Sequence, residues 1–187
     1  MKNVEIKKVG LEDLAKLQAI SRQTFHETFA SLNSAENMLA YLEASFSLEK
    51  LGHEIHMSDF YFAMDGNEPV AYLKVNLAPA QTELQETGGL EIERIYVLKS
   101  QQGKGYGNAL FDFALEMAAE KEAGYIWLGV WEKNVAAIEF YTKKGMEIFD
   151  SHVFTLGNEE QLDFLMRRPL YLSPETAKTN GQSLKKN

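Results

Sequence analysis

Three glycines between a predicted strand and a predicted helix constrain this chain more than any other feature. They lie in the run Gln102-Gly103-Lys104-Gly105-Tyr106-Gly107, directly after a strand pattern at residues 90–98. Apolar residues at helical spacing then predict a helix that opens at Gly105 or Tyr106 and ends at a Gly124 cap. The nearly continuous apolar run at 125–131 is typical of a strand buried on both faces. This order predicts a βαβ unit with two parallel strands.

The glycine-rich turn has the composition of a phosphate-binding loop. Backbone N–H groups of such a turn converge on an anion, and the N-terminus of the following helix adds a positive partial charge. A Walker loop is excluded because Gly105, rather than Ser or Thr, follows Lys104. The dinucleotide-binding fingerprint that starts at Gly103 fails at Asn108. The turn therefore indicates a pyrophosphate cradle of another kind.

The rest of the chain combines helix and strand patterns, which predict a mixed α/β (α+β) fold. The other expected elements are a strand at 4–9, a helix at 11–29, a second helix after an N-cap at Ser34, a hairpin of strands at 60–64 and 70–77, a loop at 79–89, a short helix from Asn134 to Gly145, and strands at 146–156 and 162–167. Residues 1–172 are expected to form a single domain, followed by a disordered polar tail at 173–187.

Composition excludes several classes of function. The 187 residues include no cysteine, which excludes disulfides, thiolate metal sites and a cysteine acyl-enzyme. The histidines show no metal-ligand spacing, so no metal is expected. A formal net charge of −8 disfavours nucleic-acid binding and attracts cations. No apolar stretch approaches the roughly 20 residues of a membrane span and no signal-peptide pattern is present, so a cytoplasmic protein with no membrane contact is expected.

Two spaced motifs resemble the signatures of one enzyme superfamily. Gln102, Gly105 and Gly107 fit the pattern Gln/Arg-x-x-Gly-x-Gly/Ala, which resembles the acetyl-CoA pyrophosphate loop of the GNAT superfamily of N-acetyltransferases. The run from Asn134 to Met146 resembles the second signature, Asn-x-x-Ala-x-x-Phe-Tyr-x-x-x-Gly-Phe, at the expected distance downstream. Met146 departs from the usual Phe and remains apolar.

A longer resemblance covers about residues 24–170. The runs at 25–29, 90–97, 126–134 and 151–163 look like the PaiA-type spermidine/spermine acetyltransferases. The resemblance implies the GNAT fold, a mixed sheet in which the parallel strands at 90–98 and 125–131 splay to admit the pantetheine arm. It also implies that acetyl-CoA is the cosubstrate and that a small cationic amine, such as spermidine or spermine, accepts the acetyl group.

The resemblance assigns residues to the cosubstrate. The backbone of Ile95, Tyr96 and Val97 is expected to pair with the pantetheine arm, and residues 102–108 to hold the pyrophosphate. Asn134 is expected to touch the CoA arm, and Tyr141 to face the sulfur. The full set of predicted acetyl-CoA contacts is Ile95, Tyr96, Val97, Gln102, Gly103, Lys104, Gly105, Tyr106, Gly107, Asn108, Asn134 and Tyr141.

The reaction needs a proton acceptor and a proton donor. An alkylamine with a pKa near 10.4 must lose a proton before it attacks, which at pH 7 costs about 4 to 5 kcal/mol. Glu93 shares a strand face with Ile95 and Val97, so we expect it to take this proton through water, with Glu91 or a longer water chain as alternatives. Tyr141 is expected to protonate the leaving thiolate as a general acid.

Four residues are candidates for the acceptor site. Glu27 and Glu132 are expected to hold a distal ammonium of the acceptor, beside the aromatic side chains of Phe29 and Trp131. Two other functions remain open at this point. The acceptor could be a protein N-terminus or lysine, or the chain could be a non-catalytic module that senses acyl-CoA. The oligomeric state, including a homodimer, also remains open.

Overall fold

Seven strands form one mixed sheet in the computed structural model, which describes residues 4–156 and 159–170. The strand order is β1-β2-β3-β4-β5-β7-β6, and only the β4–β5 pair is parallel. The strands are β1 (Glu5–Lys8), β2 (Asp59–Asp65), β3 (Glu68–Asn76), β4 (Gly89–Val97), β5 (Tyr125–Trp131), β6 (Glu147–Leu156) and β7 (Glu159–Pro169). This architecture confirms the predicted mixed fold, while the predicted tail at 173–187 lies outside the described residues.

Five α-helices accompany the sheet among the described residues. They are α1 (Leu14–Phe29), α2 (Ala35–Ser45), α3 (Leu48–Met57), α4 (Tyr106–Glu120) and α5 (Val135–Lys143). Ser34 begins α2 as predicted, because its hydroxyl accepts a hydrogen bond from the Asn37 N–H. Ser47 caps α3 in the same way, through the Lys50 N–H. Helix α3 was not among the predicted elements, although Ser47 and the spacing of Leu48, Leu51 and Ile55 are typical of a helix start and an apolar face.

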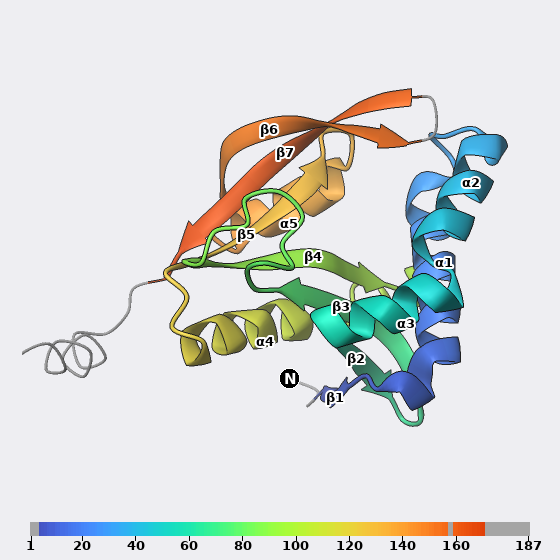
Figure 1. Cartoon of the computed structure of the whole chain (residues 1–187), viewed down its shortest axis with the longest axis horizontal. Coiled ribbons are helices and arrows are strands. Elements are labelled where there is room, and N and C mark those ends of the chain that lie inside the picture. The colour runs from blue at the N-terminus through green and yellow to red at the C-terminus, as the bar shows by residue number, and fades with distance from the viewer. Residues whose placement is uncertain (1–3, 157–158, 171–187) are drawn as a thin grey trace, which may run out of the picture.

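The helices bury the two faces of the sheet in two separate cores (Figure 1). Alternation along β3 divides its side chains, since Ala71 and Leu73 pack with α4 on one face and Tyr72 packs with α1–α3 on the other. Phe111 of α4 is fully buried in the first core, and Leu17 of α1 in the second. The sheet is therefore held rigidly between two helical layers.

The parallel strands β4 and β5 pair over only part of their length. Their register covers Gly89 with Tyr125, Leu90 with Ile126 and Glu91 with Trp127, and pairing ends there although both strands continue. Figure 1 shows the two strands diverging beyond this point. The separation leaves backbone N–H and C=O groups of β4 without a strand partner on that side. The predicted splay between these strands is confirmed.

The end of α4 differs from the prediction. The helix ends at Glu120, and Glu122 rather than Gly124 takes the left-handed conformation, with φ of 55°. The Ala123 N–H then donates to the Ala118 carbonyl at 2.9 Å, which closes the helix end in a Schellman pattern. The Gly124 N–H instead donates to the Gly88 carbonyl at 2.8 Å, so Gly124 joins the start of β5 to the loop before β4.

The β6–β7 hairpin reaches from the sheet edge to the helical layer of α1 and α2 (Figure 1). The Gln161 amide donates to the Asn33 side-chain oxygen at 2.6 Å, which ties the hairpin to the connection between α1 and α2. In the part of the chain that the structure describes, no helix has the length and apolar character needed to cross a membrane.

Candidate active site

A groove of about 420 Å³ lies where β4 and β5 separate. One wall comes from the second half of β4, through Ile95, Tyr96 and Val97, and the other from one face of α5, which carries Ala137 and Tyr141. Among the residues predicted for the site, those that line the groove are Phe29, Glu93, Ile95, Tyr96, Val97, Gln102, Gly103, Gly107, Trp131, Asn134 and Tyr141. The structure thus brings together most of the residues that the sequence singled out.

The glycine-rich turn forms one end of this groove. Gly103 and Gly105 have φ of 76° and 93°, a left-handed conformation that side chains other than glycine rarely adopt. Gly107 instead lies in α4, where an added Cβ would stand 3.6 Å from Val97 and extend into the groove. Backbone conformation therefore favours glycine at 103 and 105, whereas Gly107 is a helical position whose side chain would face the wall of the groove.

The N-terminus of α4 is not closed by a side chain. Ser34, Ser47 and Asn134 cap the starts of α2, α3 and α5, whereas α4 follows Gly105, which has no side chain to accept a hydrogen bond. The N–H groups of the first turn of a helix have no acceptor within the helix. Together with the helix dipole, they form an anion-binding end directed at the turn. This geometry fits a phosphate group.

Four of the predicted cosubstrate residues do not line the groove, namely Lys104, Gly105, Tyr106 and Asn108. The Tyr106 side chain is buried in the core beneath the sheet, so this residue has only its backbone to offer a ligand. The Lys104 ammonium is exposed and donates to the Gln101 side chain at 2.8 Å.

Asn134 and Tyr141 approach the groove from opposite ends of α5. The Asn134 side chain caps the helix by accepting from the Ala137 N–H at 3.3 Å. Tyr141 is 8% exposed, and burial raises the pKa of its phenol well above the ordinary value. Its hydroxyl is therefore protonated at neutral pH and is available as a hydrogen-bond donor.

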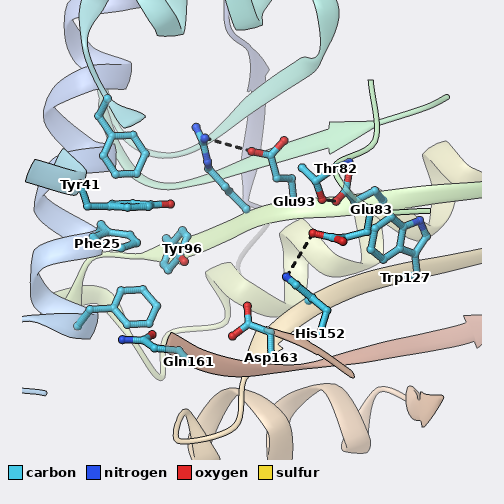
Figure 2. A pocket seen from close by; sticks show the side chains of 15 residues that line it. Phe25, Tyr41, Thr82, Glu83, Glu93, Tyr96, Trp127, His152, Gln161 and Asp163 are labelled. Atoms are coloured by element: carbon cyan, nitrogen blue, oxygen red, sulfur yellow. Dashed lines mark hydrogen bonds and ion pairs between the residues drawn. The ribbon is translucent and has the colours of Figure 1, made fainter. Parts of the chain in front are cut away.

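A second cavity, of about 200 Å³, opens beside the groove (Figure 2). Its aromatic walls include Phe25 and Tyr41, whose rings stack with centroids 4.4 Å apart. Its polar lining consists of Thr82, Glu83, Glu91, Glu93, Arg94, His152, Gln161 and Asp163. Phe29, Glu93 and Tyr96 line both spaces, so the groove and the cavity meet at these three side chains.

Glu93 at this junction belongs to a buried network of charges. Its carboxylate lies 2.6 Å from the Lys74 ammonium and 3.1 Å from the Arg94 guanidinium, and both cations also contact Glu54 of α3. Burial alone would raise the pKa of Glu93, but Arg94 and Lys74 outweigh it and hold this pKa below the ordinary value. Glu93 is therefore ionised, and it is a weaker base than an unpaired carboxylate would be.

Glu91, two residues earlier on β4, has the opposite character. It is 2% exposed and accepts hydrogen bonds from the Thr82 N–H at 3.0 Å, from the Thr82 hydroxyl and from the Asn76 amide. Burial raises the pKa of Glu91, an effect that these hydrogen bonds oppose and the charge of Glu93 increases. The Asn76 amide also donates to Glu93 at 2.6 Å, so the two carboxylates share one donor group.

The two carboxylates predicted to select the acceptor lie outside both spaces. Glu27 accepts hydrogen bonds from the Lys99 N–H at 2.8 Å and from the Gln23 amide at 2.9 Å, which joins α1 to the end of β4. Glu132 lies just past β5, where its backbone N–H donates to Leu162. Their predicted aromatic neighbours do line the groove. The ring centroids of Phe29 and Trp131 lie 5.8 Å apart there.

Sequence reasoning missed Glu83, Asp163 and the role of His152 in the lining of the cavity. Glu83 lies on the loop 77–88, while His152 and Asp163 are partners in the β6–β7 register. The His152 Nε2 lies 3.2 Å from the Glu83 carboxylate. His152 and Asp163 both belong to the run at 151–163 that the sequence singled out. Only the folded hairpin places them side by side, opposite the loop that carries Glu83.

Comparisons with known proteins agree with this geometry. The sequence profile described as Acetyltransferase (GNAT) family matches residues 17–146. An uncharacterized N-acetyltransferase in the pepI 3′ region of Lactobacillus delbrueckii subsp. lactis is 45% identical over 172 residues, which are 91% of this chain and 99% of that protein. A spermidine N(1)-acetyltransferase of Thermoplasma acidophilum is 24% identical over 155 residues, 80% of this chain and 91% of that protein.

A solved structure shares the fold. The PaiA N-acetyltransferase from Thermoplasma acidophilum, crystallised in complex with coenzyme A, superposes with a TM-score of 0.75 at 24% identity, over 90% of this chain and 99% of that chain. The profile match and the 45% identical relative confirm the resemblance to N-acetyltransferases. The chain belongs to the acetyltransferase (GNAT) family.

Proposed function

We propose that this enzyme transfers the acetyl group of acetyl-CoA to a primary amine of a small cationic acceptor, such as a polyamine. The observation that carries the proposal is the junction at Phe29, Glu93 and Tyr96. It joins a groove that fits a CoA arm to a cavity lined by aromatic rings and carboxylates. Aromatic faces and carboxylates are the groups that recognise an ammonium ion.

The groove has features that suit each part of the cosubstrate. The open N-terminus of α4 and the turn before it suit the pyrophosphate. The unpaired backbone edge of β4 at Ile95 and Val97 suits the amide groups of the pantetheine arm, which would extend the sheet between the splayed strands. This arrangement would leave the thioester near Tyr141 and Glu93, at the entrance to the second cavity.

The carboxylates of β4 suit the removal of the ammonium proton. Glu93 is ionised, and its charge at the junction would orient an ammonium or a water molecule. Glu91 has the raised pKa, is linked to Glu93 through Asn76 and lines the cavity. We assign the proton-accepting role to Glu91 acting through water, because a paired carboxylate with a lowered pKa has less affinity for a proton.

The transfer is direct, within a complex of enzyme and both substrates. The neutral amine nitrogen forms the new bond to the acetyl carbon and loses its extra proton to water, the carbon–sulfur bond breaks, and the thiolate takes a proton as it leaves. Tyr141 is the proposed donor of that proton, since its hydroxyl is protonated in the groove and forms no hydrogen bond within the described part of the chain. The chain has no cysteine that could carry the acetyl group.

A panel of acceptors assayed by CoA release tests this proposal. The panel holds spermidine, spermine, unbranched diamines, and peptides with a free N-terminus or a lysine, with acetylated products identified by mass spectrometry. We expect turnover of the small amines, because the cavity of about 200 Å³ is sized for a small molecule. Turnover of peptides alone would contradict the proposal. Tight acetyl-CoA binding without turnover of any acceptor would instead favour an acyl-CoA-sensing module.

A further inference from the structure

We propose that Asp163 and Glu83, with His152 between them, form a subsite for a second ammonium group of the acceptor, remote from the reacting nitrogen. The inference rests on the proposed function and goes further, because it names the acceptor as a diamine or longer polyamine. It also names the residues that distinguish a diamine from a monoamine of the same length.

The position of these residues defines the remote end of the cavity. The reacting nitrogen must lie at the junction, where Phe29, Glu93 and Tyr96 line both spaces. Figure 2 shows Asp163 and His152 directed into the cavity from the side opposite Glu93. They stand on the β6–β7 hairpin, whereas Glu93 stands on β4. A chain of methylene groups that starts at the junction would thus end beside the hairpin.

The charges within the cavity indicate which direction a cation takes from the junction. Toward α1 and α2 the lining is aromatic, and Arg94 lies there with its guanidinium 5.0 Å from the centre of the Phe46 ring. Arg94 is paired there with Glu54 and Glu93, so among the described residues this side offers a second ammonium no carboxylate that is free of a cation. Toward the hairpin the lining carries the carboxylates of Glu83 and Asp163. Electrostatics therefore directs the free end of a dication toward Asp163.

Asp163 is a half-buried carboxylate that still needs a partner. Within residues 4–156 and 159–170, its side chain accepts no hydrogen bond and forms no ion pair. Burial raises its pKa to about 6, with His152 lowering the pKa and Glu83 raising it. A desolvated carboxylate without a partner is destabilising, and a bound ammonium would supply the missing charge.

Glycine at position 129 leaves this carboxylate open to the cavity. Gly129 lines the cavity on β5, and a Cβ added there would stand 3.9 Å from an Asp163 oxygen. Its φ lies outside the left-handed region, so backbone conformation does not demand glycine at this position. A side chain at 129 would cover Asp163. The small residue thus has a steric role toward the cavity.

Glu83 and His152 complete the subsite at the rim. The Glu83 side chain is 36% exposed, and the His152 Nε2 lies 3.2 Å from its carboxylate. This contact holds the loop 77–88 against β6. It also places a second carboxylate within the same end of the cavity as Asp163.

Matched pairs of acceptors test the subsite. Unbranched diamines of increasing length are compared with n-alkylamines of the same carbon number, through kcat/KM for CoA release. The wild type is expected to prefer the diamine by about tenfold or more at its best length, the discrimination typical of a charge-assisted contact. Asp163→Asn is expected to remove most of that preference.

Two further variants separate the subsite from general effects. Gly129→Val covers the carboxylate without changing charge, and it should also lower the preference for the diamine. Asp150→Asn makes the same chemical change at an exposed carboxylate on β6 outside the cavity, and it should leave the preference unchanged. A diamine preference that persists in both Asp163→Asn and Gly129→Val overturns the subsite while the acetyltransferase proposal stands.

A binding measurement keeps the subsite testable if no amine is turned over. Calorimetry of the same diamines with the enzyme–CoA complex then decides the question separately from turnover. Binding to the wild type that falls about tenfold or more in Asp163→Asn supports the subsite, although the proposed reaction has failed. Equal binding to both proteins, or no binding of any diamine to the wild type, overturns it.

Discussion

Glu91 and Glu93 share the amide of Asn76 as a hydrogen-bond donor, at 2.8 Å and 2.6 Å, yet their pKa values move in opposite directions. Burial raises the pKa of Glu91. In Glu93 the neighbouring cations Arg94 and Lys74 outweigh burial and lower it. Two carboxyl groups with separated pKa values, joined by one amide, are the arrangement expected where one orients charge and the other exchanges a proton.

The first prediction concerns the pH dependence of catalysis. A proton acceptor works only when it is ionised, so the rate should fall as pH drops through the pKa of Glu91. Because that pKa is raised, the fall should occur at a higher pH than for an ordinary glutamate. Glu91→Gln should lower kcat by about 100-fold and remove this step from the pH–rate profile. An unchanged profile in Glu91→Gln would assign the step to another group.

Glu93→Gln should differ from Glu91→Gln in its effect on stability. It leaves Lys74 and Arg94 without one of their carboxylate partners in a buried network, so this variant should lose stability as well as activity. Removing one member of a buried ion pair costs about 3 to 5 kcal/mol in general. Chemical denaturation of the two variants should therefore separate them, with Glu91→Gln the more stable protein.

The second prediction concerns Tyr141. Tyr141→Phe removes the hydroxyl and keeps the ring, which packs against Phe140 and Phe111 with centroids 5.3 Å and 6.3 Å away. We expect kcat to fall about tenfold or more, equivalent to at least about 1.4 kcal/mol of transition-state stabilisation. The Kd for acetyl-CoA and the Tm should stay near wild type. Full kcat in this variant would show that the thiolate takes its proton from water.

A third prediction addresses the cosubstrate groove. Gly107→Val adds a side chain at a helical position that lines the groove, so it should raise the Kd for acetyl-CoA by about 100-fold, or ~2.7 kcal/mol. Gly52→Val makes the same change within α3, away from the groove, and should leave the Kd unchanged. Isothermal titration calorimetry of both proteins checks this. A Kd for acetyl-CoA in Gly107→Val equal to that of the wild type would show that the phosphates bind outside this groove.

The fourth prediction links the pKa of Asp163 to stability. Its pKa is about 6 in the folded protein against an ordinary value of 3.8, so the ionised form is destabilising. The penalty is absent below the unfolded pKa and grows as pH rises through about 6. The full shift corresponds to about 3 kcal/mol, and partial solvent exposure reduces the expected effect to about 1 kcal/mol.

Asp163→Asn should consequently be more stable than the wild type at pH 7.5, with a Tm higher by about 2 to 4 °C. The difference should vanish at about pH 3, where the Asp163 carboxyl group is neutral in both the folded and the unfolded state. Thermal unfolding at the two pH values measures this. A variant that is less stable than the wild type at pH 7.5 would show that the carboxylate has a stabilising partner in the folded protein.

The sequence predicted the residues that line the groove between β4 and β5 far better than those that line the second cavity. Residues 125–131 match β5, and Asn134 caps α5 as expected, because both depend on local patterns of burial and capping. Apart from Thr28 and Phe29, the residues that line the groove lie between Ile92 and Tyr141, so one stretch of the sequence forms most of it. Its geometry therefore follows from turn chemistry and helix position.

The acceptor cavity depends on contacts between distant segments. The sequence places Glu27 and Glu132 beside Phe29 and Trp131, but the Glu27 carboxylate accepts a hydrogen bond from the Lys99 N–H and neither carboxylate lines the cavity. Asp163 and Glu83 are brought to the same space by the β6–β7 hairpin and the loop 77–88. No periodicity within either segment indicates where the other will lie.

Initial-rate kinetics with both substrates varied test the central claim most directly, since the junction at Glu93 requires acetyl-CoA and amine to occupy the two spaces together. Rates are measured over a grid of acetyl-CoA and spermidine concentrations, and the enzyme is examined by intact mass after incubation with acetyl-CoA alone. The account predicts double-reciprocal lines that intersect and an enzyme of unchanged mass. Parallel lines together with an acetylated enzyme would contradict it.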